Sequence, residues 1–116
     1  TAAESLRARG YAVIDGAVGA SRAKDFQGEI AALKERNVMY ANATHVVDRA
    51  GGKQLLFKDH IFEWDTAHPG WPSTSKLIPG LDGLANDVHL RSSLNEAMPE
   101  LNLVSQTMKI QHNKGS

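Results

Sequence analysis

The stretch Leu103–His112 constrains the fold of this chain most, because its residues alternate between the two sides of an extended backbone. A period of two predicts a β-strand with one face on a core. Two members of the better inward face are polar, and a polar side chain that faces a core needs a hydrogen-bond partner or a ligand. That face consists of Val104, Gln106, Met108, Ile110 and His112.

Residues 113–116 have the sequence Asn-Lys-Gly-Ser, which is typical of a turn, so the predicted strand leads into a loop. A strand without a neighbour leaves its backbone N–H and C=O groups unpaired. We therefore expect Leu103–His112 to pair with another strand of the chain. We also expect the helix at residues 21–36 to cover the outside of that sheet.

Three helices are predicted from their caps and from helical spacing. Thr1-Ala2-Ala3-Glu4 matches a capping box and starts a short helix that runs to about Ala8. Pro79 occupies a favoured first-turn position and starts a helix that Met98-Pro99 stops. The longest helix is Ser21–Arg36, and its apolar face consists of Ala23, Phe26, Ile30 and Leu33.

Two further strands complete the expected order of elements. Tyr11–Asp15 is a β-rich run that Gly16 closes, and we expect it to be a buried strand. Leu55–Asp65 is expected to be a strand with Trp64 on one face and Glu63 on the other. Residues 37–53 predict an irregular loop around a short extended piece, Thr44–Val47. The result is an α+β pattern within one domain and without an internal repeat.

Composition excludes several classes of function. Thirteen Lys and Arg balance thirteen Asp and Glu without a run of like charge, so neither nucleic acid nor a membrane is an expected partner. No apolar run approaches the roughly 20 residues that a membrane-spanning helix needs. The chain has no Cys, which excludes disulfides and thiolate metal ligands and fits an intracellular reducing compartment.

The segment Gln106–Gly115 resembles the strand that leads into the iron-binding His-x-Asp motif of 2-oxoglutarate/Fe(II)-dependent dioxygenases of prolyl 4-hydroxylase type. The order of the elements from Gly10 to Met98 is similar to that family as well. The family often carries Asp-x-Ile-x-Trp where this chain has His60-Ile61-Phe62-Glu63-Trp64. The resemblance implies that residues 1–116 are the N-terminal half of a distorted double-stranded β-helix, or jelly roll, with helices packed on its major sheet.

The same resemblance implies an activity. The full domain would use Fe(II) to decarboxylate 2-oxoglutarate to succinate and to hydroxylate a peptide side chain or a small molecule. The iron ligands would follow Ser116, so residues 1–116 alone are expected to bind neither cofactor and to be inactive. The alternative is a non-catalytic, dioxygenase-like module for packing or interaction. Its partner would be a larger assembly, whereas the partner of the enzyme segment would be the rest of the dioxygenase domain.

The residues support one candidate for a cofactor contact and no metal ligand. None of the five histidines, His45, His60, His68, His89 and His112, has Asp or Glu two positions later, so none begins the iron motif, and we predict no catalytic residue. By resemblance, the position of His112 often carries a Tyr whose hydroxyl contacts 2-oxoglutarate. A ring N–H of His112 could donate the same hydrogen bond. The alternative is a strand-end residue that lies half in solvent.

Overall fold

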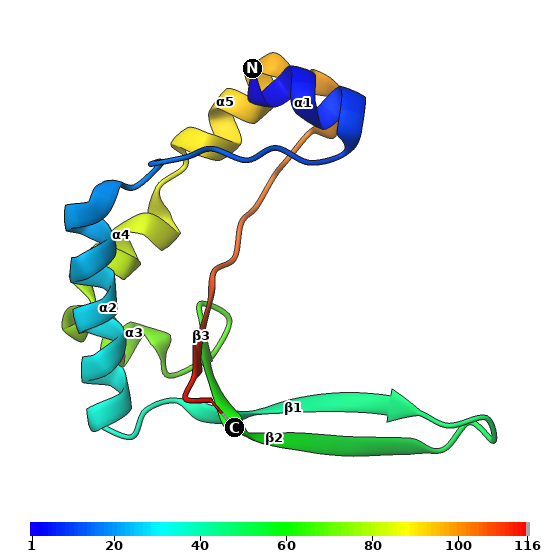
Figure 1. Cartoon of the computed structure of the whole chain (residues 1–116), viewed down its shortest axis with the longest axis vertical. Helices are drawn as coiled ribbons and strands as arrows, with labels where there is room; N and C mark the ends of the chain where they lie inside the picture. Colours follow the sequence, from blue (N-terminus) through cyan, green and yellow to red (C-terminus); the bar gives the residue numbers. More distant parts are fainter. Residues whose placement is uncertain (116) are drawn as a thin grey trace.

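The structure is a computed structural model that describes residues 1–115, and it is of the α+β class (Figure 1). Its strands form one antiparallel sheet in the order β1-β2-β3. The strands are β1 (Tyr40–Val47), β2 (Lys53–Asp65) and β3 (Lys109–Asn113). The helices are α1 (Ala2–Arg9), α2 (Gly19–Glu35), α3 (Trp71–Thr74), α4 (Pro79–Asn86) and α5 (His89–Ala97), with 3₁₀ turns η1 (Ser75–Leu77) and η2 (Pro99–Leu101).

The core lies where α2 meets the inner end of the sheet. Trp64 of β2 pairs with Ile110 of β3, and residues that are directly opposite in an antiparallel pair share a face. Leu33, on the predicted apolar face of α2, is fully buried in the same cluster. The other buried members of the cluster are Met39, Trp71, Ile78 and Leu81. The expected helix at residues 21–36 and the expected pairing of the last strand are therefore confirmed, the latter for β3.

Two polar contacts tie the segments after β2 to this core. The indole Nε1 of Trp64 donates to Thr74 Oγ1 at 3.1 Å, which satisfies a buried N–H. The Glu29 carboxylate on α2 accepts hydrogen bonds from the backbone N–H groups of Gly80 and Leu81, at 2.6 and 2.8 Å. These are free N–H groups at the start of α4, so Glu29 caps that helix from a neighbouring one.

Helix α1 begins as predicted and is held to the end of α5 and to η2. Thr1 and Glu4 form the capping box, and Gly10 ends the helix with φ of 80°, a value that favours glycine. Arg7 donates to the backbone oxygen of Ala97 at 2.8 Å and to the carboxylate of Glu100 at 3.1 Å. Because both groups are exposed, this ion pair contributes little to stability.

Two of the expected strands are wrong in whole or in part. Tyr11–Asp15 forms no strand, and Val13 is 78% exposed. The last strand begins only at Lys109, because residues 103–107 are extended but have no strand beside them, and Val104 is 79% exposed. A β-prone sequence becomes a strand only where another strand satisfies its backbone groups.

Two other expectations also need correction. The helix expected from Pro79 to Met98 is two helices, because Asp87 has an extended backbone and its Oδ1 accepts from the N–H of His89 at the start of α5. The loop expected at residues 37–53 is largely strand β1, which forms a hairpin with β2. Asp48 closes that hairpin by accepting from the N–H groups of Ala50 and Gly52.

The β1–β2 hairpin extends well beyond the helices (Figure 1). Phe57 is 65% exposed there, and large parts of Leu55 and Leu56 are exposed as well. The radius of gyration is 17.2 Å, compared with about 13 Å for a compact chain of this length. The sheet is therefore longer than the layer of helices that covers it.

Candidate functional site

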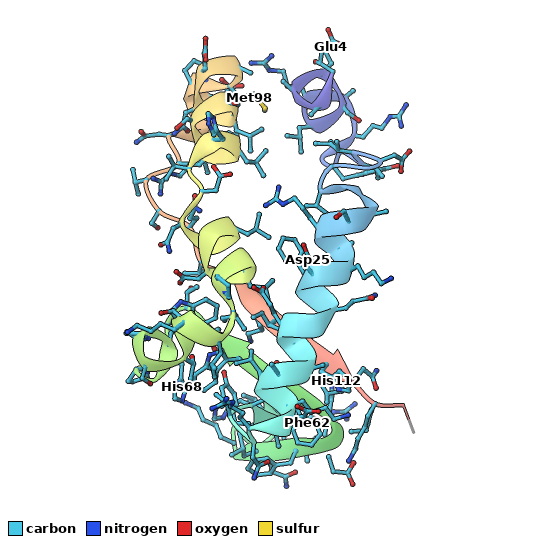
Figure 2. All side chains as sticks on the ribbon, turned by 90° about the vertical axis from the view of Figure 1, so that its left-hand side faces the viewer. Glu4, Asp25, Phe62, His68, Met98 and His112 are labelled. Carbon is cyan, nitrogen blue, oxygen red and sulfur yellow. The ribbon has the colours of Figure 1, made fainter. Side chains whose placement is uncertain are left out.

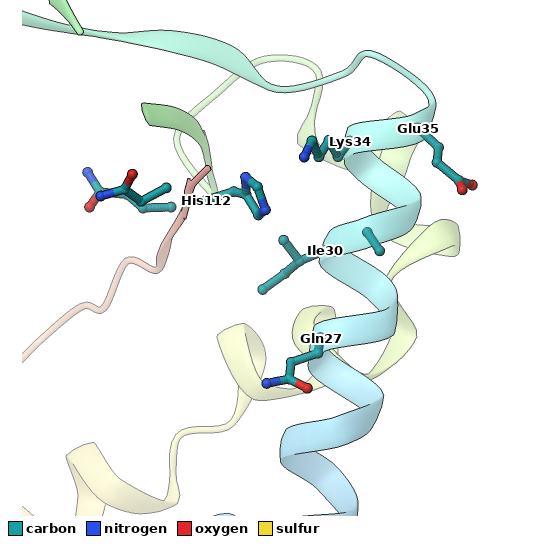
Figure 3. A pocket seen from close by; sticks show the side chains of 8 residues that line it. Gln27, Ile30, Lys34, Glu35 and His112 are labelled. Carbon is teal, nitrogen blue, oxygen red and sulfur yellow. The ribbon is translucent and has the colours of Figure 1, made fainter. Parts of the chain in front are cut away.

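His112 lies beside an open groove of about 710 Å³ between α2 and β3 (Figure 3). Residues of α2 form one wall of the groove, and the end of β3 forms the other. Figure 3 shows the side chains of Lys34 and Ile30 directed toward His112, and that of Glu35 directed away from it. The lining residues are Gln27, Ile30, Ala31, Lys34, Glu35, Gln111, His112 and Asn113.

One ring nitrogen of His112 has no hydrogen-bond partner in the described part of the chain. This nitrogen, Nδ1, is buried from solvent. A buried N–H donor without an acceptor costs more free energy than a buried ring nitrogen that only lacks a donor. We therefore place the ring proton on the other nitrogen, Nε2. The ring of His112, which lines the groove, then carries one N–H donor, at Nε2. Whether this donor contacts 2-oxoglutarate stays a prediction.

We expected α2 to cover the outside of the sheet, and it covers the face that was predicted to point inward instead. Ile110 and His112 lie on the face that the helix covers, not on a face turned away from it. The reason is the pairing of β3 with β2, which places Ile110 beside Trp64 and His112 beside Phe62. This apolar face of the inner strands buries against α2, and the polar residues between them point to the other side.

Gln106, the second polar member of the predicted inward face, has partners outside the sheet. Its side-chain amide donates to the backbone oxygens of Ala85 and Asp87, at 2.8 and 2.7 Å. These carbonyls lie at the end of α4, where the helix leaves C=O groups without internal partners. Gln106 therefore anchors the extended segment before β3 to the α4–α5 junction.

On the face turned away from α2, Glu63 joins the three strands. It is 4% exposed, and its Oε1 accepts hydrogen bonds from the side-chain amides of Asn42 on β1 and Gln111 on β3. The Lys109 ammonium lies 3.6 Å from the same oxygen. Burial alone would raise the pKa of Glu63, but the hydrogen bonds and the charge of Lys109 outweigh it and hold this pKa below its ordinary value of 4.5.

Tyr40 and Asp65 form a second polar pair at the inner end of β1 and β2. The Tyr40 hydroxyl donates to Asp65 Oδ2 at 2.6 Å, and the tyrosine ring stacks on His68 with the centroids 5.5 Å apart. The hydrogen bond to Asp65, burial and the nearby carboxylates raise the pKa of Tyr40 to about 12. The same hydrogen bond lowers the pKa of Asp65.

No sequence signal indicates the Glu63 network, because a lone Glu in a predicted strand is typical of an ordinary surface charge. The network depends on the register of both strand pairs, in which Glu63 is opposite Tyr40 on β1 and opposite Gln111 on β3. His60 lies on the same strand, with its Nδ1 3.5 Å from Asp59 Oδ1 and its side chain 39% exposed.

Residues 1–115 do not fit an Fe(II) site. An iron site of the resembled type needs two His and one carboxylate on one face of the metal. Across the described residues, no group of three or more His, Cys, Asp or Glu side chains is placed to hold a metal ion.

Among residues 1–115, every helix is too short or too polar to cross a membrane. No family model, curated protein or solved structure matches the chain.

Proposed function

We propose that this chain is the N-terminal segment of a 2-oxoglutarate/Fe(II)-dependent dioxygenase domain of prolyl 4-hydroxylase type. The resemblance of Gln106–Gly115 to the strand before the iron motif supports the proposal. The order of the elements supports it as well: helices pack on one face of an antiparallel sheet, and β3 is the last element of that sheet. In this proposal, a jelly roll is completed by strands outside residues 1–115.

The observation that carries the proposal is the position of His112. It lies in the strand that resembles the approach to the iron motif, and its ring, with the N–H on Nε2, lines an open groove. A carboxylate of 2-oxoglutarate is an acceptor for that N–H, and a hydrogen bond to a charged group is stronger than one between neutral groups. The groove has the volume of an ordinary small-molecule site.

This segment would hold the cosubstrate and shape its site. Fe(II), bound by residues outside 1–115, would supply the oxidative chemistry when present. Within the segment, the buried contact of Trp64 with Ile110 and α2 would fix β3. A fixed β3 would in turn fix the direction of the His112 ring, which is how a binding group is kept in a productive geometry.

A second candidate function is a non-catalytic module for packing or interaction. The exposed β1–β2 hairpin favours it. Leu55, Leu56 and Phe57 are consecutive in β2 and exposed, so both faces of the hairpin carry exposed apolar side chains. A strand with apolar residues on both faces is normally covered on both. Either a further part of the same domain or another protein of an assembly would cover the hairpin.

The intact mass of the source polypeptide separates the two candidates. The enzyme proposal predicts a native chain much longer than 116 residues, with His-x-Asp soon after Ser116, because the iron ligands have to lie there. The module proposal predicts a native chain that ends near Ser116. Sequencing of the same polypeptide by fragmentation would locate the motif, and a long chain without His-x-Asp would contradict the enzyme proposal.

A further inference from the structure

Lys34 faces His112 across the groove and comes from a different element. It lies in the last turn of α2, and its side chain is directed toward the His112 ring (Figure 3). Among the ion pairs that residues 1–115 form, none includes Lys34. The neighbouring Glu35 also lines the groove but is directed away, so its carboxylate does not neutralise the ammonium across the groove.

Two lysines in or beside β3 are already engaged. The Lys114 ammonium lies over the Phe62 ring, 5.2 Å from its centroid, and Lys109 is held by Glu63 on the opposite face. Lys34 is thus the cation that the groove offers to a ligand. It stands opposite the His112 ring, on which we place the N–H donor at Nε2.

The groove also has an apolar part. Ile30 and Ala31, which lie on α2 one turn before Lys34, line it together with Lys34 and His112. Figure 2 shows from a second direction that His112 and Phe62 lie beside the lower end of α2. The groove therefore combines two hydrogen-bond donors, one of them charged, with a short apolar surface.

We infer that Lys34 and His112 form a carboxylate-binding pair, and that the groove takes a carboxylate with a short aliphatic chain, without any need for a metal. The ammonium and the ring N–H hold the carboxylate oxygens, and the aliphatic carbons lie on Ile30 and Ala31. This inference deepens the proposed function by adding Lys34, a residue far from the resembled segment. It departs from the expectation that residues 1–116 alone hold no cosubstrate, and it depends only on the groove, so it can fail while the proposed function stands.

The test uses glutarate as the probe, because it has two carboxylates and a short chain but no 2-oxo group that could chelate a metal. Nuclear magnetic resonance of the full 116-residue chain, with a chelator and at constant ionic strength, would follow backbone amides during the titration. We expect saturable shifts at the end of α2 and in β3. Glutaramide, the neutral analogue, should cause no such shifts at the same concentration.

Matched variants then assign the site. Lys34 is exposed, so Lys34→Gln should fold, and it should weaken glutarate binding about tenfold, which is the loss of one charge-assisted hydrogen bond. Lys24→Gln removes the same charge from α2 outside the groove and should leave the affinity within about twofold. Shifts that do not saturate, equal shifts with glutaramide, or equal losses in the two lysine variants would overturn the inference.

A comparison of ligands identifies which carboxylate the groove prefers. If 2-oxoglutarate and glutarate bind equally under the same metal-free conditions, the carboxylate pair alone accounts for the binding. A glutarate titration that fails in a folded chain removes Lys34 and His112 as a pair. The dioxygenase proposal is tested separately, by the mass and the activity of the native polypeptide.

Discussion

Among residues 1–115, Glu63 is the most enclosed charged residue, and its hydrogen bonds come from both neighbouring strands. Glu63→Ala would leave the amides of Asn42 and Gln111 without their acceptor. We expect it to lower the free energy of unfolding by about 2 kcal/mol. Glu96→Ala, at an exposed helical position, should change it by no more than about 0.5 kcal/mol. Denaturant titrations of the two variants check this, and equal effects would contradict it.

The lowered pKa of Glu63 also predicts how stability depends on pH. A carboxyl whose pKa is lower in the folded state than in the unfolded state stabilises the fold above its unfolded value of 4.5. That contribution is lost as the pH falls below 4.5 and through the folded pKa. Denaturant titrations from pH 6 to 3 should therefore show a smaller loss of stability in Glu63→Gln than in the parent chain. Parallel curves would contradict the assignment.

Tyr40 gives a spectroscopic test of the second polar pair. The chain has two tyrosines, so the Tyr11→Phe variant reports Tyr40 alone. Its ultraviolet titration should have a midpoint near pH 12, because ionisation breaks the hydrogen bond to Asp65 and places two anions together. Asp65→Asn removes the negative charge and should move the midpoint toward 10. An unshifted midpoint of 10 in a chain that circular dichroism shows to be folded would contradict the pair.

His112 has a prediction that needs the native enzyme. His112→Ala should raise the apparent KM for 2-oxoglutarate roughly tenfold, which is the effect of losing one hydrogen bond to a charged group. His112→Tyr should be tolerated, because it restores the residue that is common in the resembled family. Steady-state kinetics against 2-oxoglutarate provide the measurement. Unchanged dependence on 2-oxoglutarate in a folded His112→Ala enzyme would leave His112 as a strand-end residue.

At the scale of single elements, local sequence signals predicted best where they were strong. Helix α2 was predicted because four apolar residues repeat at helical spacing, and the capping box located the start of α1. Strand β2 was predicted almost in full from its β-rich composition. Each of these signals lies within one segment, so no knowledge of the rest of the chain was needed.

The wrong elements depend on neighbours that the sequence does not specify. Tyr11–Asp15 and residues 103–107 have strand-like composition, but no strand of the described chain lies beside them. The groove could not be predicted for the same reason, because Lys34 and His112 are far apart in the sequence and meet only when α2 packs on β3. The face of the sheet that α2 covers follows from the β2–β3 register, which alternation alone leaves open.

The packing of α2 on the sheet predicts a large difference between two leucines. Leu33 is fully buried, whereas Leu55 on the projecting hairpin is 45% exposed. Leu33→Ala should lower the free energy of unfolding by about 3 kcal/mol, because it removes buried methyl groups and leaves a cavity. Leu55→Ala should cost less than about 1 kcal/mol. Thermal or denaturant unfolding checks both, and similar losses would contradict the described core.

At the scale of the whole molecule, the chain is open. The radius of gyration of 17.2 Å and the exposed run Leu55–Phe57 indicate a sheet built to be covered by more protein. Both candidate functions supply such a cover. In a jelly roll it would be the second sheet of the same domain, and in a module it would be a partner protein. The α+β class follows from the structure, whereas the jelly roll stays part of the proposal.

The most direct test of the central claim is succinate formation by the native polypeptide. It should be measured with Fe(II), 2-oxoglutarate and O₂, beside residues 1–116 alone, which lack two His and a carboxylate at workable spacing. The dioxygenase account predicts succinate that requires both Fe(II) and 2-oxoglutarate in the native polypeptide, and none above background from residues 1–116. No succinate from a folded, iron-loaded native polypeptide, or turnover by residues 1–116 alone, would contradict the account.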